Sequence, residues 1–136
     1  MNKEQLEELH RQAEKKRQEA IAEVSSILEK GNLLDEDWYP TEDCLRAIEL
    51  WDWNDSKGWF SFIKSVWYMA SWGWREGSMV THDGFYNKMV YQYDISTAGW
   101  SGNESIIQAM KKNHMLWNEC WVMSRRGGHY KMEISE

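Results

Sequence analysis

The segment from Ile95 to Ile134 restricts the possible folds more than any other part of the chain. It reads ISTAGWSGNESI and, further on, WVMSRRGGHYKMEI, which predicts a strand, a glycine-containing turn, a helix, a strand, a hairpin turn and a final strand. A short strand at 75–81, a turn over His82-Asp83-Gly84 and a clearer strand at 87–95 come before it. The expected order of this half is therefore ββαββ.

The helix expected at 101–112 connects the strands at 87–95 and 115–124. A helical crossover of ordinary, right-handed form joins parallel strands, whose C-terminal ends lie at the same edge of the sheet. The sequence therefore predicts that the loop after the first strand lies beside the turn after the second.

Two local signals define the ends of these elements. Ser101 and Glu104 match the capping box S-x-x-E, in which each side chain bonds the backbone amide of the other residue. In the last hairpin, a loop of two residues or of four keeps Trp121 and Met123 against apolar residues of the final strand. A loop of three residues would set Trp121 opposite polar neighbours, so a two- or four-residue loop is expected.

The first thirty residues favour a helix, because they are rich in Glu, Lys, Gln and Ala and contain no Gly or Pro. Gly31-Asn32 would end this helix. Its first half has too little apolar surface to pack deeply, so residues 1–30 are expected to be a charged, projecting helix and 31–136 a single α+β domain. Self-association through Leu6 and Leu9 is an alternative, although the heptad pattern does not persist along the helix.

Two more helices are expected before the sheet. Thr41 resembles an N-cap for a helix that ends near Trp51, and apolar residues recur at helical spacing over 59–70. The predicted fold class is therefore α+β, with an N-terminal helical segment of about three helices followed by the ββαββ sheet unit.

Composition limits the function. The net charge of −6 argues against direct nucleic-acid binding and suits docking onto a basic surface of a partner. The N-terminus lacks the apolar region of a signal peptide, and no apolar run reaches membrane-spanning length, so a cytoplasmic location is expected. Cys44 and Cys120 are predicted to be reduced core thiols. Ten tryptophans are unusual for this length, and most are expected in the core.

The two turns that should meet at one sheet edge contain the candidate ligand-binding residues. Small residues, helix N-terminal amides, two guanidinium groups and an indole would favour an anion or a nucleotide. The simpler interpretation is that Ser101 and Glu104 only cap a helix while the arginines only solvate a hairpin. The candidates are Ser96, Thr97, Trp100, Ser101, Asn103, Glu104, Arg125, Arg126 and His129.

No catalytic residue, metal site or cofactor is predicted. The stretch around Ser101 resembles a nucleophile elbow, but Asn103 stands where the second glycine of G-x-S-x-G is required, which weakens a triad of Ser101, His129 and Asp94. The four histidines have no ligand spacing. Enzymatic activity stays open, and a non-enzyme is favoured.

ISTAGWSGNESIIQAM and CWVMSRRGGHYKMEI together resemble small proteins of tailed bacteriophages and prophages. The resemblance covers roughly the last two thirds of the chain and is marked by GWSGNE at 99–104 and SRRGGHY at 124–130. It brings no activity and no residue roles. It implies the cytoplasm of an infected bacterium, and the binding of host or defence proteins or of small ligands.

Two hypotheses follow. The first is a non-catalytic accessory binding protein that engages a host or defence protein through an acidic, Trp-rich surface. The alternative is a protein or enzyme for a small anionic or nucleotide-like ligand, with a pocket formed by the 96–104 and 125–129 loops.

Overall fold

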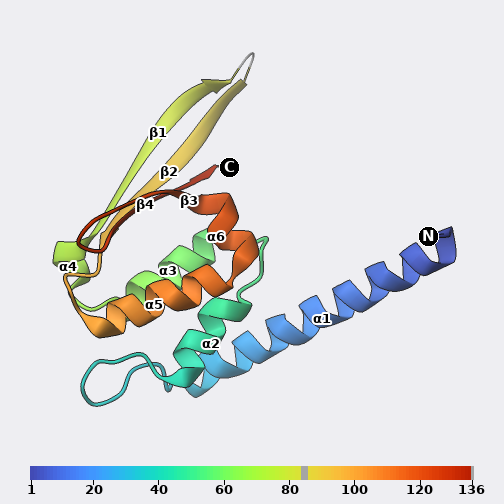
Figure 1. Cartoon of the computed structure of the whole chain (residues 1–136), viewed down its shortest axis with the longest axis horizontal. Helices are drawn as coiled ribbons and strands as arrows, with labels where there is room; N and C mark the ends of the chain where they lie inside the picture. Colours follow the sequence, from blue (N-terminus) through green and yellow to red (C-terminus); the bar gives the residue numbers. More distant parts are fainter. Residues whose placement is uncertain (84–85, 136) are drawn as a thin grey trace.

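The computed structural model describes residues 1–83 and 86–135 (Figure 1), so Gly84 of the predicted turn at 82–84 lies outside the described residues. Among the described residues, four helices precede the first strand, and two more lie between the first pair of strands and the last pair. The helices are α1 (Lys3–Lys30), α2 (Glu42–Leu50), α3 (Ser56–Val66), α4 (Ala70–Gly73), α5 (Ser101–Lys112) and α6 (His114–Cys120). The strands are β1 (Trp74–Asp83), β2 (Tyr86–Ser96), β3 (Trp121–Arg125) and β4 (His129–Ser135). The α+β class is confirmed.

Helix α1 projects from the rest of the molecule (Figure 1). A capping box of Asn2 and Gln5 starts it, and Gly31 ends it with φ of 70°, as a left-handed C-cap. Only Val24 and Ile27 of α1 are buried, and α1 packs against α2. The predicted helix and its end at Gly31 are therefore confirmed.

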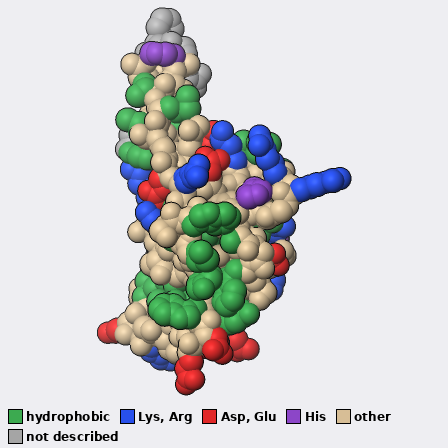
Figure 2. Space-filling view, turned by 90° about the vertical axis from the view of Figure 1, so that its left-hand side faces the viewer, with side chains coloured by type: hydrophobic (Ala, Val, Ile, Leu, Met, Phe, Trp, Pro, Cys, Tyr) green, Lys and Arg blue, Asp and Glu red, His purple; other side chains and the backbone are tan. Residues whose placement is uncertain are grey.

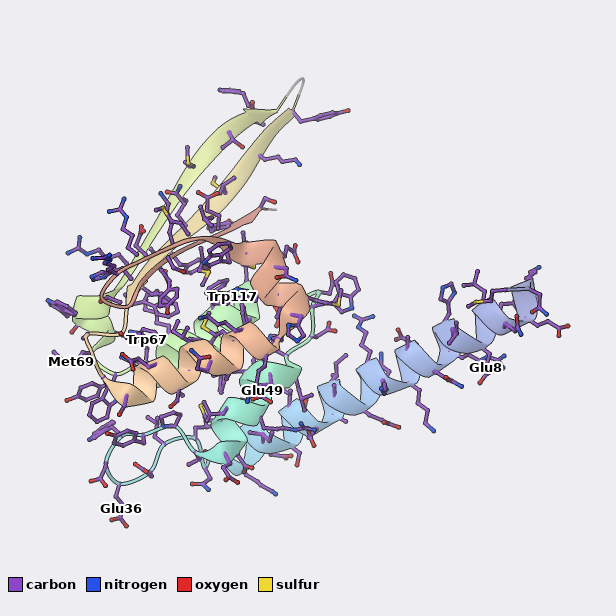
Figure 3. The ribbon with its side chains drawn as sticks, in the orientation of Figure 1. Glu8, Glu36, Glu49, Trp67, Met69 and Trp117 are labelled. Carbon is purple, nitrogen blue, oxygen red and sulfur yellow. The ribbon has the colours of Figure 1, made fainter. Side chains whose placement is uncertain are left out.

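A bidentate ion pair marks the point where α1 leaves the body. The Arg17 guanidinium donates to both carboxylate oxygens of Asp52, at 2.7 and 3.0 Å, and lies 5.1 Å from the centre of the Trp53 ring. Hydrogen bonding from Arg17 is the main cause that lowers the pKa of Asp52. Figure 3 shows Glu8 on the part of α1 that lies away from the other elements.

The four strands form one antiparallel sheet in the order β1-β2-β4-β3. Both β2 and β3 are antiparallel to β4, so they run in the same direction with β4 between them. In β2 the side chains alternate, with Tyr93 and Ile95 buried and Asp94 exposed between them. The buried side faces the helices, and the other side is called the outer face of the sheet below.

Helices α3 and α5 lie beneath the sheet (Figure 1) and supply nine of the 22 buried core residues that the structure describes. The Phe60 ring stacks on Tyr93 with centroids 4.1 Å apart. The largest fully buried apolar side chains are those of Trp59, Phe60, Ile48, Ile63, Ile106, Ile107, Met110, Leu116 and Met132.

Three expectations about the C-terminal half are wrong in detail. The segment expected as a strand from residue 115 is helix α6 up to Cys120, because Asn113 accepts a hydrogen bond from the Leu116 amide and the i, i+4 pair Leu116 and Cys120 is buried. Ser101 does not cap α5. The N-cap is Trp100, because the Trp100 amide bonds Thr97 O and starts the helix one residue earlier.

The hairpin between β3 and β4 has a three-residue loop, where a loop of two or four residues was expected. Arg125 pairs with His129, which leaves residues 126–128 in the loop. A bulge then leaves Val122 without a pairing partner, so Trp121 still lies opposite the apolar Met132. The extra residue reconciles the loop length with the apolar pairing of Trp121, but Met123 pairs with Lys131 and not with the apolar residue that was expected.

Fewer tryptophans are buried than expected. Only Trp59, Trp67 and Trp74 are buried, whereas four are exposed: Trp38, Trp53, Trp72 and Trp121. Two of the buried indoles donate to backbone carbonyls, Trp59 to Ile48 and Trp67 to Ser96. The remaining tryptophans therefore pack at the edge of the core or give the protein an aromatic surface.

Candidate functional site

The end of β2 and the turn between β3 and β4 meet at one edge of the sheet. Ser96 pairs with His129, which pairs with Arg125, and the Thr97 amide donates to Gly128 O at 3.0 Å. The side chain of Thr97 is 1% exposed, and a Cβ atom at Gly128 would overlap its hydroxyl. A glycine at 128 is thus what permits the two turns to approach each other.

A groove of about 510 Å³ lies at this end of the sheet and is called the outer-face groove. One row of paired residues crosses its floor, in which Arg75, Asp94 and Lys131 lie side by side on β1, β2 and β4. Trp72 of α4 borders it as well. Its lining is Trp72, Gly73, Arg75, Asp94, Ile95, Ser96, Met123, Arg125, His129, Tyr130 and Lys131.

The outer-face groove is basic although the protein is acidic. Arg75, Arg125 and Lys131 supply three positive charges and Asp94 one negative charge, which leaves a local charge of +2. Within the described part of the chain, none of these four side chains forms an ion pair. Their charges are therefore available to a bound group.

Only three of the nine predicted ligand residues, Ser96, Arg125 and His129, line this groove. Thr97 is buried beside it, and Arg126 is exposed in the turn without lining it. The other four belong to the start of α5 and lie elsewhere: Trp100, Ser101, Asn103 and Glu104.

The residues at the start of α5 join a different cluster. The Trp100 ring lies between Tyr39 and Tyr68, with centroids 4.5 Å from each, and Ser101 Oγ donates to the Tyr39 hydroxyl at 3.1 Å. Asn103 is buried, and its amide group bonds both the N–H and the C=O of Tyr68 at 2.9 Å. Glu104 is exposed in the first turn. Asn103 thus ties α5 to the chain after α3.

Around this cluster lies an exposed apolar surface, which we call the aromatic end face. In the space-filling view it is the run of hydrophobic side chains with acidic groups below it and basic groups above it (Figure 2). Trp38, Met69 and Trp72 are 63%, 51% and 58% exposed. The aromatic end face consists of the exposed Trp38, Tyr39, Met69 and Trp72 together with the partly buried Tyr68 and Trp100.

Backbone strain gathers at the same end of the molecule. Among the described residues, three that are not glycine have positive φ: Trp38 at 70°, Met69 at 58° and Ala98 at 55°. The left-handed region costs a residue with a Cβ atom roughly 1–2 kcal/mol. In Figure 3, Met69 points away from the body of the protein. Two strained positions therefore hold large apolar side chains in solvent.

The loop that carries Trp38 is held in one shape. Asp35 Oδ1 accepts from the amides of Asp37 and Tyr39 at 2.8 and 3.0 Å, while the Asp35 amide donates to Tyr39 O at 2.9 Å. Thr41 bonds Asn32 O and Leu33 O across the base of the loop. Trp38 is therefore presented by a preorganised turn. Glu36 lies at its tip (Figure 3).

The side chains that could do covalent chemistry are poorly placed for it. Ser101 bonds Tyr39 and does not line the groove that contains Asp94 and His129. Cys44 and Cys120 are free and buried, and burial raises the pKa of each thiol to about 12, so both are protonated near neutral pH. Among the described residues, no group of three His, Cys, Asp or Glu side chains could hold a metal ion.

Most residues of the outer-face groove and of the aromatic end face were not predicted from the sequence. Arg75 and Lys131 could have been placed beside Asp94 if the strand register had been known, because residues that pair across strands share one face of the sheet. The positive φ angles of Trp38 and Met69 have no comparable sequence signal, since glycine is the residue that normally marks such positions.

No protein-family model, curated protein or solved structure matches this chain. Within the described residues, no helix combines the length and the apolar character needed to cross a membrane.

Proposed function

We propose that this chain is a non-catalytic binding protein that engages a protein partner through the aromatic end face. The single observation that carries the proposal is that Trp38 and Met69 adopt unfavourable backbone conformations and yet expose their side chains. Neither side chain recovers the cost of its strain by burial in the fold. Such strain is typical of positions where function, and not stability, selects the residue.

The chemistry of the end face indicates the kind of partner. Large apolar side chains in a rigid setting act as anchors that insert into pockets of a second protein. Asp35, Glu36 and Asp37 lie in the loop beside Trp38, so the partner should surround its apolar pocket with lysine or arginine. The resemblance of the C-terminal segments to phage proteins supports a host or defence protein of an infected bacterium as that partner.

A capture experiment with matched variants tests this proposal. Trp38→Gly and Met69→Gly remove an anchor while glycine accepts the positive φ, so the fold should keep its stability. Tyr86→Ala removes an exposed aromatic side chain from the start of β2 and serves as the control. The tagged protein and each variant are incubated with bacterial lysate, and the captured proteins are quantified by mass spectrometry.

The proposal expects one stoichiometric partner that the full protein and Tyr86→Ala retain and that both glycine variants lose. Raising the salt concentration should weaken the capture, because the acidic loop contributes. Capture of the same proteins in equal amounts by all four proteins would contradict the proposal, as would the absence of any stoichiometric partner.

A further inference from the structure

The outer-face groove is separate in chemistry from the aromatic end face, and it calls for a different ligand. Its cations come from three strands: Arg75 from β1, Lys131 from β4 and Arg125 from β3. Neighbouring strands lie about 4.8 Å apart, so β1 and β3, at the two edges of the sheet, are roughly 14 Å apart. Two long arginine side chains at this spacing can close on a group of small-molecule size from opposite sides.

The cations favour an anion with several oxygen atoms. A guanidinium group bonds phosphate through two parallel N–H donors, and lysine adds a point charge. Arg125 stands beside His129 in the register, which adds a ring nitrogen to the same end of the groove. Phosphate is therefore the anion that this set of donors suits best.

The remaining lining requires more than an anion. The Trp72 indole is 58% exposed and borders the groove, so it offers a face on which a planar ring can stack. Asp94 is the one carboxylate in the lining, between Arg75 and Lys131 in the register. A carboxylate only accepts hydrogen bonds, so the ligand must offer a hydroxyl or amino group at this point.

From this arrangement we infer that the outer-face groove binds a small phosphorylated compound that carries a planar ring and a hydroxyl or amino donor. A mononucleotide is the simplest compound with all three features. Its ring stacks on Trp72, its sugar hydroxyls or base amino group donate to Asp94, and its phosphate bonds Arg125 with Arg75 or Lys131. A volume of about 510 Å³ is within the range of small-molecule sites.

Isothermal titration calorimetry of the full chain tests the inference. The probes are the four ribonucleoside monophosphates, adenosine and inorganic phosphate. At least one monophosphate should bind with a dissociation constant below about 1 mM, and both adenosine and inorganic phosphate should bind at least tenfold more weakly. Phosphate that binds as tightly as every nucleotide would reduce the groove to a plain anion site and overturn the inference. No binding by any monophosphate would overturn it too.

The adjacent arginines provide a matched pair of variants. Arg125→Ala removes a cation that lines the groove, whereas Arg126→Ala removes an exposed cation of the same turn that does not line it. Arg125→Ala should weaken nucleotide binding at least tenfold, and Arg126→Ala should change it less than twofold. Equal weakening by the two would show that only the general charge of the turn matters, against the inference.

Two further variants test the ring and the donor. Trp72→Ala should lower the affinity for the nucleotide at least fivefold and leave the affinity for inorganic phosphate unchanged. Asp94→Asn keeps the size of the side chain and an oxygen acceptor but removes a negative charge, so it should raise the affinity for inorganic phosphate more than the affinity for the nucleotide. Because Trp72, Asp94 and the arginines are not in the core, circular dichroism of each variant should match that of the parent protein. Unchanged nucleotide binding by both variants would contradict the inference.

Discussion

At the sheet edge that forms the groove, the contact between Thr97 and Gly128 is expected to be the point where an added methyl group destabilises the fold most. Gly127 and Gly128 have similar φ angles, 87° and 78°, so an alanine at either position meets the same backbone strain. Their surroundings differ. A Cβ atom at Gly127 would lie 3.4 Å from the His129 ring, an ordinary contact, whereas one at Gly128 would overlap the Thr97 hydroxyl.

These differences set the expected magnitudes. Left-handed strain of roughly 1–2 kcal/mol, less the 0.5–1 kcal/mol that alanine recovers by restricting the unfolded chain, gives about 1 kcal/mol for Gly127→Ala. Overpacking adds roughly 1–3 kcal/mol at Gly128, so Gly128→Ala should cost about 3 kcal/mol. Urea unfolding followed by circular dichroism measures both values.

A double-mutant cycle separates overlap from backbone strain. Thr97→Ala removes the hydroxyl that the new methyl group would overlap, so Gly128→Ala should cost about 2 kcal/mol less in that background. The same substitution should not change the cost of Gly127→Ala. Equal losses in the free energy of unfolding for Gly127→Ala and Gly128→Ala would contradict the close approach of the two turns. A loss for Gly128→Ala that Thr97→Ala does not reduce would contradict it as well.

Three other outcomes are expected. Asn103→Ala should cost about 3 kcal/mol in urea unfolding, because it leaves the N–H and C=O groups of Tyr68 without their partner; a loss under about 1 kcal/mol would argue against this tie. Replacing Leu6 and Leu9 together by Gln should change neither the free energy of unfolding nor the number of chains per assembly in native mass spectrometry, since both side chains are exposed; a change in the number of chains would instead reveal self-association through α1. The two buried thiols stay protonated in the fold while the unfolded chain loses these protons above a pKa of about 8.5. The contribution of the two thiols to the free energy of unfolding should therefore be fully present below about pH 8.5 and decline as the pH rises toward the folded pKa of about 12. Urea unfolding at rising pH should show a smaller decline for Cys44→Ala than for the parent protein.

Local signals in the sequence were sufficient for the elements that are determined locally. Helix α1 follows from its composition and from Gly31, and α2 begins after Thr41, which accepts a hydrogen bond from the Cys44 amide. The alternation of β2 gave its buried and exposed faces. In each case the residues that decide the structure are within a few positions of one another.

Contacts between distant residues decided the rest. Ser101 fits a capping box by sequence, but its hydroxyl bonds Tyr39, 62 positions earlier, and α5 begins at the turn formed by Thr97 and Trp100. The bulge at Val122 shows the same limit, because it depends on how Trp121 pairs with Met132 across the hairpin. In both places a tertiary contact, and not a local sequence pattern, determines the structure.

The candidate site divides for a related reason. The sequence predicted that the loop after β2 and the turn after β3 meet at one sheet edge. The register places Ser96, His129 and Arg125 together there. The prediction also placed all of residues 96–104 in one loop that faces the ligand. In the structure the chain enters α5 directly, and Trp100 turns to Tyr39 and Tyr68.

Trp72 belongs to both surfaces, which gives the two proposals a common consequence. The Met69 carbonyl accepts from the amides of Trp72 and Gly73, so the strained Met69 fixes the direction of α4 and with it the position of the Trp72 indole. A ring stacked on that indole would cover apolar area that a protein partner needs. Nucleotide and partner are therefore expected to compete. Because binding free energies are linked, each should weaken the affinity of the other by the same factor, and Trp72→Ala should abolish that coupling.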